Sequence, residues 1–446
     1  MRKNRYSQFI AFAFAVGFVS FSPAVFAQDS RNLSLEEAIQ LSLQNNKQLK
    51  LSNAKVKEAT ASLHEAKDNR LPDLKASGSF LRINNPTIDL KVKLGSGSGG
   101  PPPTVNQVTY GMISASLPLF SGLRIHCGIE SAKYLEQASK LDAENDREEV
   151  IQNTIAAYSN LYKANEAVEM MKQNLRESKQ RVEDFTNLEK NGLLARNDLL
   201  KAELQQSNIE LSLLDAENNQ NITYINMNLM LGLPERTALV ADSSGFQNLS
   251  DAGTAIDWEQ QAFQNRRDMA SLSARARAAN MNIKATKGEY FPGLALSGGY
   301  IALDVPNFIT VTNALNGGIG LQYSISSLWK TPAKVAQARA RFEEVEANKD
   351  ILADAIRIQV NQAYENYLSS QKKIIVYAKA VEQAEENYRI TKNKYTNNLA
   401  TTTDLLDADV AQLQARLNYT FSKADALVTY KKLQQAAGVL NNNQKK

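Results

Sequence analysis

The chain has 446 residues, with one cysteine, two histidines and two tryptophans, and 22% of its residues are charged. A lone cysteine excludes a disulfide framework and any zinc or iron–sulfur site built from cysteines, and two histidines exclude a histidine-rich metal centre. The net charge of +4 comes mostly from Arg2, Lys3 and Arg5. Without residues 1–27 the chain carries 48 basic against 47 acidic groups, so we expect no nucleic-acid partner.

Residues 1–27 have the pattern of a secretory signal peptide. A positively charged start is followed by an apolar stretch from Phe9 to Phe21 and by Ala24-Val-Phe-Ala27, a small-x-small cleavage site. The alternative, an uncleaved membrane anchor, is disfavoured because the apolar stretch is short. The sequence predicts export and, because no later run of 18 apolar residues exists, no transmembrane helix in the mature chain.

The exported part contains an internal duplication. Identical residues recur at an offset of 220 between segments 40–78 and 260–298, and at an offset of 206 between segments 158–232 and 364–438. The difference of 14 indicates an insertion in the first copy, where the low-complexity stretch 95–103 lies. A long fixed period indicates two copies of one structural unit. We assign them to residues 28–233 and 255–440, with a linker at 234–254 and a polar tail at 441–446.

Each copy begins with a predicted helical stretch, residues 35–70 in the first and 256–289 in the second. Ser34-Leu-Glu-Glu37 matches a capping box at the start of the first stretch. Both stretches end before a proline, Pro72 or Pro292, which disfavours helix in the residue before it.

A predicted β-hairpin follows in each copy, at about residues 73–120 and 293–328. Apolar residues alternate with small or polar ones, most clearly at Ile319, Leu321, Tyr323 and Ile325. Period-two segments of about ten residues have the length of a tilted strand that crosses a bilayer. A soluble hairpin is the alternative, and the strands alone do not decide between the two.

The rest of each copy is a predicted long helical hairpin, residues 123–231 and 331–440. Residues 123–190 contain no proline, and this length of helix is roughly 100 Å. Asn191-Gly192 and Asn397-Asn398 end the outgoing helices, because both residue types tolerate the left-handed conformation of a tight reversal. Apolar spacing alternates three and four along a coiled-coil seam at Val168, Met171, Leu175, Ser178, Val182 and Phe185, and again at Ile374, Tyr377, Val381, Ala384, Tyr388, Thr391 and Tyr395.

Four strands are too few to close a sheet in lipid. An open edge there leaves backbone groups unpaired at several kcal/mol each, and the smallest closed barrels need about eight strands. The chain must therefore borrow strands from copies of itself, and a cyclic oligomer would also arrange the helical hairpins into a tube.

Several motifs in this order resemble the TolC family of outer-membrane efflux proteins, over nearly all of residues 33–440. They are Leu33-Ser-Leu-Glu-Glu-Ala-Ile39, Asn45-Asn46, Leu71-Pro-Asp-Leu74, Leu117-Pro-Leu-Phe-Ser-Gly122, Asn191-Gly192 with Asp198-Leu-Leu200, and Thr403-Asp-Leu-Leu-Asp-Ala408. The resemblance implies a mainly α fold with a small β portion. Three chains would give four strands each to one 12-stranded barrel, and the coiled-coil hairpins would form an α-barrel across the periplasm.

In function, the resemblance implies the outer-membrane exit duct of a tripartite efflux or type I secretion system. A periplasmic adaptor and an inner-membrane pump would dock at the helical tips, and the protein itself would use no cofactor and catalyse no reaction. The rival interpretations are a periplasmic coiled-coil adaptor or scaffold, which normally has one hairpin with lipoyl and β-barrel modules, and an exported enzyme. No nucleophile–base or metal constellation supports the enzyme.

The resemblance assigns a gate to residues beside the two reversals. Asp404 and Asp407, one helical turn apart, match acidic positions that ring the periplasmic entrance and would favour cations. The alternative for Asp404 is a cap on the returning helix. Asp198 matches a polar network with Tyr395 that holds the entrance closed, although Ala400 stands where well-known members have an arginine.

The reversals themselves would be the adaptor-docking surface: Gly192, Leu193, Leu194, Asn398 and Leu399. For the leucines, packing between the two arms of the hairpin is an equal alternative. His64, His126 and Cys127 have no third ligand near them in sequence, so we assign them neither a metal nor a catalytic role.

Overall fold

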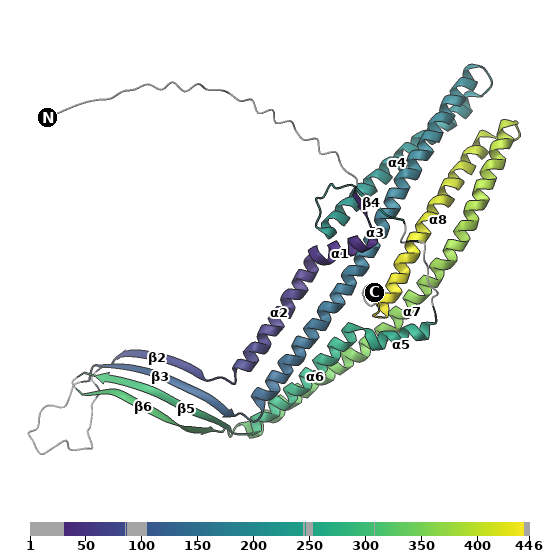
Figure 1. Cartoon of the computed structure of the whole chain (residues 1–446). Coiled ribbons are helices and arrows are strands. Elements are labelled where there is room, and N and C mark those ends of the chain that lie inside the picture. Colours follow the sequence, from purple (N-terminus) through teal and green to yellow (C-terminus); the bar gives the residue numbers. More distant parts are fainter. Residues whose placement is uncertain are drawn as a thin grey trace, which may run out of the picture.

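The computed structural model describes residues 31–84, 86, 105–243, 246, 253–306 and 308–440. The predicted signal peptide, the stretch 95–103 and the tail 441–446 lie outside the described residues. The molecule is elongated, with a curved sheet at one end, two helical hairpins reaching the other end, and long helices joining them (Figure 1). A mainly helical fold with a small β portion is thereby confirmed.

The two copies contain the same elements in the same order. The first comprises β1 Arg31–Leu33, α1 Leu35–Asn45, α2 Lys47–Asp68, β2 Asp73–Arg82, β3 Gln107–Phe120, α3 Arg124–Lys190 and α4 Arg196–Leu231. The second comprises α5 Ala255–Asn265, α6 Arg267–Lys287, β5 Gly293–Val305, β6 Ile309–Gln322, α7 Ser327–Thr396 and α8 Thr402–Ala436, with a 3-10 turn, η2 Gly288–Tyr290, that has no counterpart in the first copy. The strand β4 Leu239–Ala241, the counterpart of β1, lies in the stretch 234–254 that was predicted as a linker.

The first helical stretch of each copy is two helices, where the sequence analysis predicted one. Asn46 interrupts the first with an extended backbone (φ −62°, ψ 128°), and its side chain accepts hydrogen bonds from the Gln48 and Leu49 amides at 2.7 and 3.3 Å. Arg266 interrupts the second with nearly the same angles. A local N-cap thus restarts α2 after the break.

The predicted capping box at Ser34 is only half formed. The Glu37 amide donates to Ser34 Oγ at 3.1 Å. The Glu37 carboxylate does not return the bond, because it accepts from Arg31 Nη2 at 2.5 Å instead. In the second copy α7 begins at Ser327, earlier than the predicted start at residue 331, and Pro332 lies in its second turn, where it removes one helical hydrogen bond.

The strands form one antiparallel sheet in the order β2-β3-β5-β6. Pairing runs from Asp73↔Ser116 to Arg82↔Gln107 between the first two strands, and β3 joins the copies by pairing with β5. The outer strands β2 and β6 each have one neighbour, so both edges of the sheet are open.

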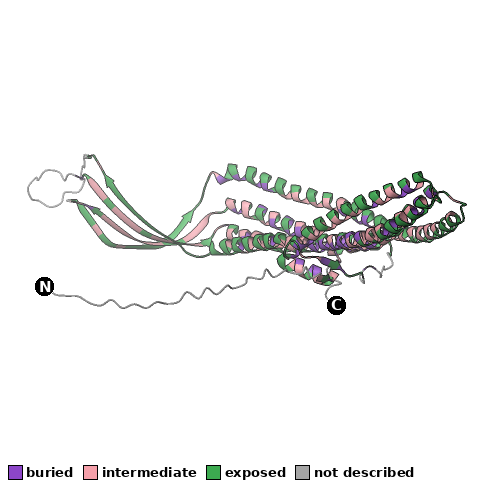
Figure 2. Ribbon diagram, turned by 90° about the horizontal axis from the view of Figure 1, so that it is seen from above, coloured by how far each residue is buried: buried purple, intermediate pink, exposed green. Residues whose placement is uncertain are grey.

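The strand register sorts the sheet's side chains onto two faces, because paired residues share a face and neighbours in a strand alternate. Neither face is covered by a helix (Figures 1 and 2). In the half of the sheet nearer the helices one face is apolar and carries Leu74, Ala76, Ile113, Ala115, Leu117, Leu294, Leu296, Tyr300, Leu315, Ile319 and Leu321. Farther from the helices this face carries Phe80 together with the polar residues Arg82, Gln107, Thr109 and Asp304. In the half nearer the helices the opposite face carries mostly small or polar side chains, among them Asp73, Lys75, Ser77, Ser114, Ser116, Ser297, Asn316 and Gln322. Farther from the helices this opposite face carries apolar side chains such as Leu81, Val108, Met112, Ile301 and Leu303.

The helices form a single curved layer built around α3. Near the sheet the order is α2, α3, α6, α7, and beyond the middle it is α4, α3, α8, α7. In both halves α7 stands at one side of the layer, and α2 or α4 stands at the other. No helix among the described residues is both long and apolar enough to cross a membrane.

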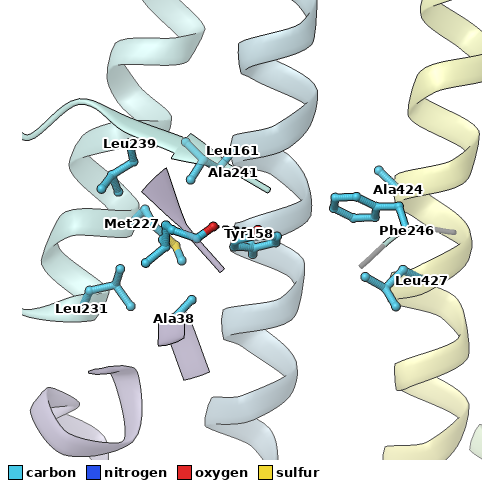
Figure 3. Close-up of a cluster of buried hydrophobic side chains, with 11 residues drawn as sticks. Ala38, Tyr158, Leu161, Met227, Leu231, Leu239, Ala241, Phe246, Ala424 and Leu427 are labelled. Carbon is cyan, nitrogen blue, oxygen red and sulfur yellow. Dashed lines mark hydrogen bonds between the residues drawn. The ribbon is translucent and has the colours of Figure 1, made fainter. Parts of the chain in front are cut away.

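The best-buried core lies where the halves meet. There the small parallel pair β1–β4 and Phe246 pack beside α3 (Figure 3). Tyr158 is 1% exposed, and its hydroxyl lies 2.8 Å from the Leu33 carbonyl oxygen and 3.0 Å from that of Asp242. Burial raises the pKa of the Tyr158 hydroxyl far above its ordinary value. This core fixes the hairpins to the middle of the molecule and leaves their tips free.

Candidate gate at the helical tips

Both helical hairpins turn at the same end of the molecule (Figure 1). In the first, Gly192 has φ +73° and the Leu193 amide donates to the Leu188 carbonyl at 2.9 Å. In the second, Asn398 has φ +57° and the Leu399 amide donates to the Lys394 carbonyl at 2.8 Å. The two turns therefore close in the same way, with asparagine taking the glycine's left-handed position in the second.

The tip leucines fall into two groups. Leu193 and Leu399 are 74% and 75% exposed and touch no core. Leu194 is half-buried and packs against a cluster of Phe185, Leu199, Ala202 and Leu405. Packing between the hairpin arms therefore accounts for Leu194 alone, and the other two present apolar surface to the outside.

Asp404 caps α8. Its amide donates to Thr401 Oγ1 at 3.1 Å, and its carboxylate accepts from the Thr401 amide at 2.8 Å and from the Thr401 hydroxyl at 2.6 Å. These bonds, the hydroxyl's first, hold the pKa of the Asp404 carboxyl below its ordinary value. Asp407 lies one turn further on, and both acids are exposed while Leu405 and Leu406 between them are buried. The capping alternative is thus present, and it leaves the carboxylate charged and facing outward.

Asp198 and Tyr395 do not meet within the described chain. The Asp198 carboxylate accepts from Lys201 Nζ at 3.3 Å, because lysine stands one turn along the same helix. The Tyr395 ring stacks on Phe185 with 5.8 Å between ring centroids. Within one chain Asp198 therefore has a local ion pair and Tyr395 an aromatic contact between α3 and α7, and the polar network that would hold the entrance closed stays a prediction.

A buried ion pair that the sequence analysis missed joins the two hairpins. Arg181 Nη1 on α3 donates to Asp409 Oδ2 on α8 at 2.9 Å, and the two side chains are 10% and 4% exposed. Arg181 Nη2 also lies 3.5 Å from the Tyr388 hydroxyl on α7. Burial alone would lower the pKa of Arg181, but the hydrogen bond and charge of Asp409 outweigh it and raise that pKa.

Sequence patterns gave little sign of this pair. The two residues are 228 positions apart, and at the repeat offset of 206 their counterparts are Asn387 and Glu203, so the pair is not duplicated. The one available signal was an arginine beside Val182 in the coiled-coil seam. Together with the apolar cluster around Phe185, the pair forms a buried contact that holds the first hairpin against the second near the tips.

The remaining candidates do not gather into a site. His64 lies exposed on α2, and His126 and Cys127 lie in the first turn of α3. Among the described residues no group of three metal-ligating side chains comes together.

Residues 38–233 and 258–439 match the model of the outer membrane efflux protein family. The match spans both copies and most of the chain, so the chain belongs to this family. It is an outer-membrane channel protein that extends into the periplasm and serves as an exit duct for efflux or secretion. The adaptor interpretation is therefore set aside.

Individual proteins agree with this assignment. The chain is 22% identical over 420 residues to toxin and drug export protein A of Aggregatibacter actinomycetemcomitans, covering 89% of this chain and 84% of the relative. It is 20% identical over 419 residues to the outer membrane efflux protein BepC of Brucella suis, covering 92% and 86%. Its fold resembles the outer membrane channel CmeC of Campylobacter jejuni, with a TM-score of 0.75, 18% identity and coverage of 92% and 88%.

Proposed function

We propose that three copies of this chain close around one axis into a continuous duct, with four strands from each in a 12-stranded barrel. The observation that carries the proposal is the sheet, which is open at both β2 and β6 and has an uncovered apolar face. Lipid cannot satisfy open strand edges, and pairing β2 of one copy with β6 of the next removes every edge.

The two faces of the sheet support the same arrangement. Leu315, Ile319 and Leu321 on the apolar face are 81%, 69% and 71% exposed, which suits contact with acyl chains. In the half of the sheet nearer the helices, the opposite face is rich in serine and glycine and would then line a water-filled lumen. In the helical layer α7 would pack on α2 and α4 of the next copy, and α4 offers exposed apolar side chains there, including Leu204, Leu211 and Leu214.

The hairpin tips are proposed as the closed periplasmic entrance. Three copies of Asp404 and Asp407 would form acidic rings around the pore, and Asp198 and Tyr395 would lie at the same constriction. The Arg181–Asp409 pair would hold each first hairpin to its second hairpin while the entrance is closed. Residues 1–27 would direct export and then be removed.

Partners are proposed to dock at the turns. A periplasmic adaptor would contact Gly192, Leu193, Leu194, Asn398 and Leu399, of which Leu193 and Leu399 are the exposed apolar contacts. An inner-membrane pump would supply the driving force, so that this protein catalyses no reaction itself. Relatives named for toxin and drug export and for efflux support this role.

Ion selectivity tests the acidic rings. Replacing Asp404→Asn together with Asp407→Asn removes six carboxylates from a trimer and should reduce the cation-to-anion permeability ratio in planar bilayers. The Thr401 cap of α8 is untouched by this change, and the amide oxygen of an asparagine at position 404 can still accept from the Thr401 amide, so the turn should stay folded. Glu235→Gln, an exposed acid on the loop after α4, is the matched control.

The outcomes separate the parts of the proposal. An unchanged permeability ratio in the double variant would remove both acids from the constriction. A purified wild-type protein that is monomeric in detergent by light scattering would contradict the trimer itself.

A further inference from the structure

The four connections between strands and long helices meet at one end of the sheet (Figure 1). Large apolar side chains are exposed there in the single chain: Leu71 at 59%, Phe120 at 44%, Leu123 at 62%, Phe291 at 58% and Trp329 at 64%. Phe120 pairs with Leu294 on the apolar face of the sheet, so this group continues that face toward the helices. We call these five residues the junction belt.

Cationic side chains lie among the residues of the junction belt. Arg70 and His126 line one shallow pocket with Pro118, Phe120, Leu123 and Ile125. Lys330 follows Trp329 on α7. Within the part of the chain that the structure describes, the side chains of Arg70, His126 and Lys330 have no hydrogen bond or ion pair. Arg124 donates only its Nε, to the Ser121 carbonyl oxygen at 2.9 Å.

The acids nearby leave this charge largely uncompensated. Asp73 is held by Lys75 at 2.7 Å, and Glu289 is held by Lys334 at 2.7 Å. Asp68, exposed at the end of α2, is the remaining acid close to Arg70 in the chain. The junction therefore combines unpaired cations with exposed apolar and aromatic side chains. The cations would be costly to bury in the hydrocarbon interior, and the apolar side chains would be costly to expose to water.

We infer that the junction belt with Arg70, Arg124 and Lys330 binds the anionic headgroups of phospholipids in the periplasmic leaflet. The inference rests on the proposed placement of the sheet in the outer membrane. The helices extend from this end of the sheet into the periplasm, so the junction lies at the level of that leaflet's headgroups. Aromatic rings and the stems of arginine and lysine bind at such an interface, and each cation near an anionic surface adds attraction for the phosphate. Charge complementarity selects anionic over zwitterionic lipid.

Trp329 provides a local reporter, because the chain has only one other tryptophan, Trp258, which packs on α7 far from the sheet. In a Trp258→Phe background, the trimer is placed in nanodiscs that contain brominated phosphatidylglycerol or brominated phosphatidylcholine, and quenching of Trp329 is titrated. We expect an apparent affinity about fivefold or more higher for phosphatidylglycerol, falling as salt is added. Soluble glycerol phosphate should not displace the lipid.

The combined variant Arg70→Gln with Lys330→Gln should bring the two lipid affinities close together. Arg196→Gln, an exposed arginine at the opposite end of the molecule, should leave the ratio unchanged. The heat-modifiable trimer band on gels checks that each variant is assembled.

Two other outcomes count against different claims. Strong quenching by both lipids with no preference, or a preference that the combined variant retains, overturns the headgroup site and leaves the channel intact. No quenching of Trp329 by either brominated lipid overturns the placement of the sheet in the membrane, and the proposed function with it.

Discussion

Arg181 and Asp409 occupy positions where helix packing leaves each side chain about a tenth exposed or less. Removing two charges from water is costly, and their mutual attraction repays it only while both partners are present. Truncating one partner leaves the other buried and uncompensated. Exposed pairs behave differently, because water and salt screen them.

This contrast predicts a double-mutant result. Arg181→Met should destabilise the tip region by about 3–5 kcal/mol, whereas Arg181→Met combined with Asp409→Leu should cost far less. The exposed pair Arg389–Glu386, with a 2.7 Å contact, supplies the control, and Arg389→Met should leave the unfolding temperature almost unchanged. Thermal unfolding followed by helical circular dichroism measures all three. Equal losses of stability for Arg181→Met and Arg389→Met would show that the buried ion pair matters no more to stability than the exposed one.

At the scale of elements, the repeat explains a packing contact that occurs in both copies. The returning helix, α4 or α8, ends against the break in the first helical stretch of its copy. Gly232 and Gly438 end α4 and α8 with φ +72° and +69°. A Cβ at Gly232 would lie 2.9 Å from the Asn45 side chain, and one at Gly438 would lie 2.9 Å from the Arg266 amide nitrogen. Asn45 Nδ2 also donates to the Leu231 carbonyl at 2.7 Å. In the second copy Asn265 Nδ2 donates within its own helix, to the Gln261 carbonyl at 2.9 Å, and Arg266 Nη1 donates to the Ala436 carbonyl at 3.3 Å. The duplicated glycines thus mark the same close approach, with different hydrogen bonds beside it.

Gly438→Ala should therefore destabilise the protein more than Gly192→Ala. Both glycines have a positive φ, which costs an alanine roughly 1 kcal/mol, but a Cβ at Gly192 would meet nothing within 4 Å. At Gly438 the obstacle is backbone, which cannot rotate away, so a further loss is expected. The melting temperatures of the two variants give the comparison. A loss at Gly192 as large as at Gly438 would contradict the close packing of α8 against the Arg266 break.

At the scale of the whole molecule, the register of four strands decides which side of the sheet meets lipid. Leu315 and Asn316 are neighbours on β6, are both exposed, and lie on opposite faces. Because the side-chain period of a strand is two, one step along the chain changes the expected surroundings from acyl chains to water.

A lysine at each of these positions should therefore have different effects. Leu315→Lys should impair outer-membrane assembly, since a lysine on the lipid face costs about 2–4 kcal/mol near the bilayer midplane, and Asn316→Lys should be tolerated. Membrane fractionation and the yield of heat-modifiable trimer report the difference. The reverse result would exchange the lipid and lumen faces.

Much of this architecture follows from local pattern. The reversals at Asn191-Gly192 and Asn397-Asn398, the period-two strands and the long seam were predictable because each depends on residues close together in sequence. The duplication then fixed the order of elements in the second copy. The helix breaks were missed. Asn46, a good N-cap residue, was a local signal for the first break, whereas Arg266 makes no such cap and is extended where α8 ends against it, a contact that leaves no local signal.

The sequence by itself determined the elements, their lengths and the family resemblance, because hydrophobic periodicity and turn residues act over a few positions. Only the tertiary structure decided which charges became partners. It buried Arg181 with Asp409, which lie 228 positions apart in the chain, and left Arg70 and Lys330 unpaired beside the exposed aromatic rings. Electrostatic partners depend on distances across helices that lie hundreds of residues apart in the chain, and those distances exist only once the helices have packed.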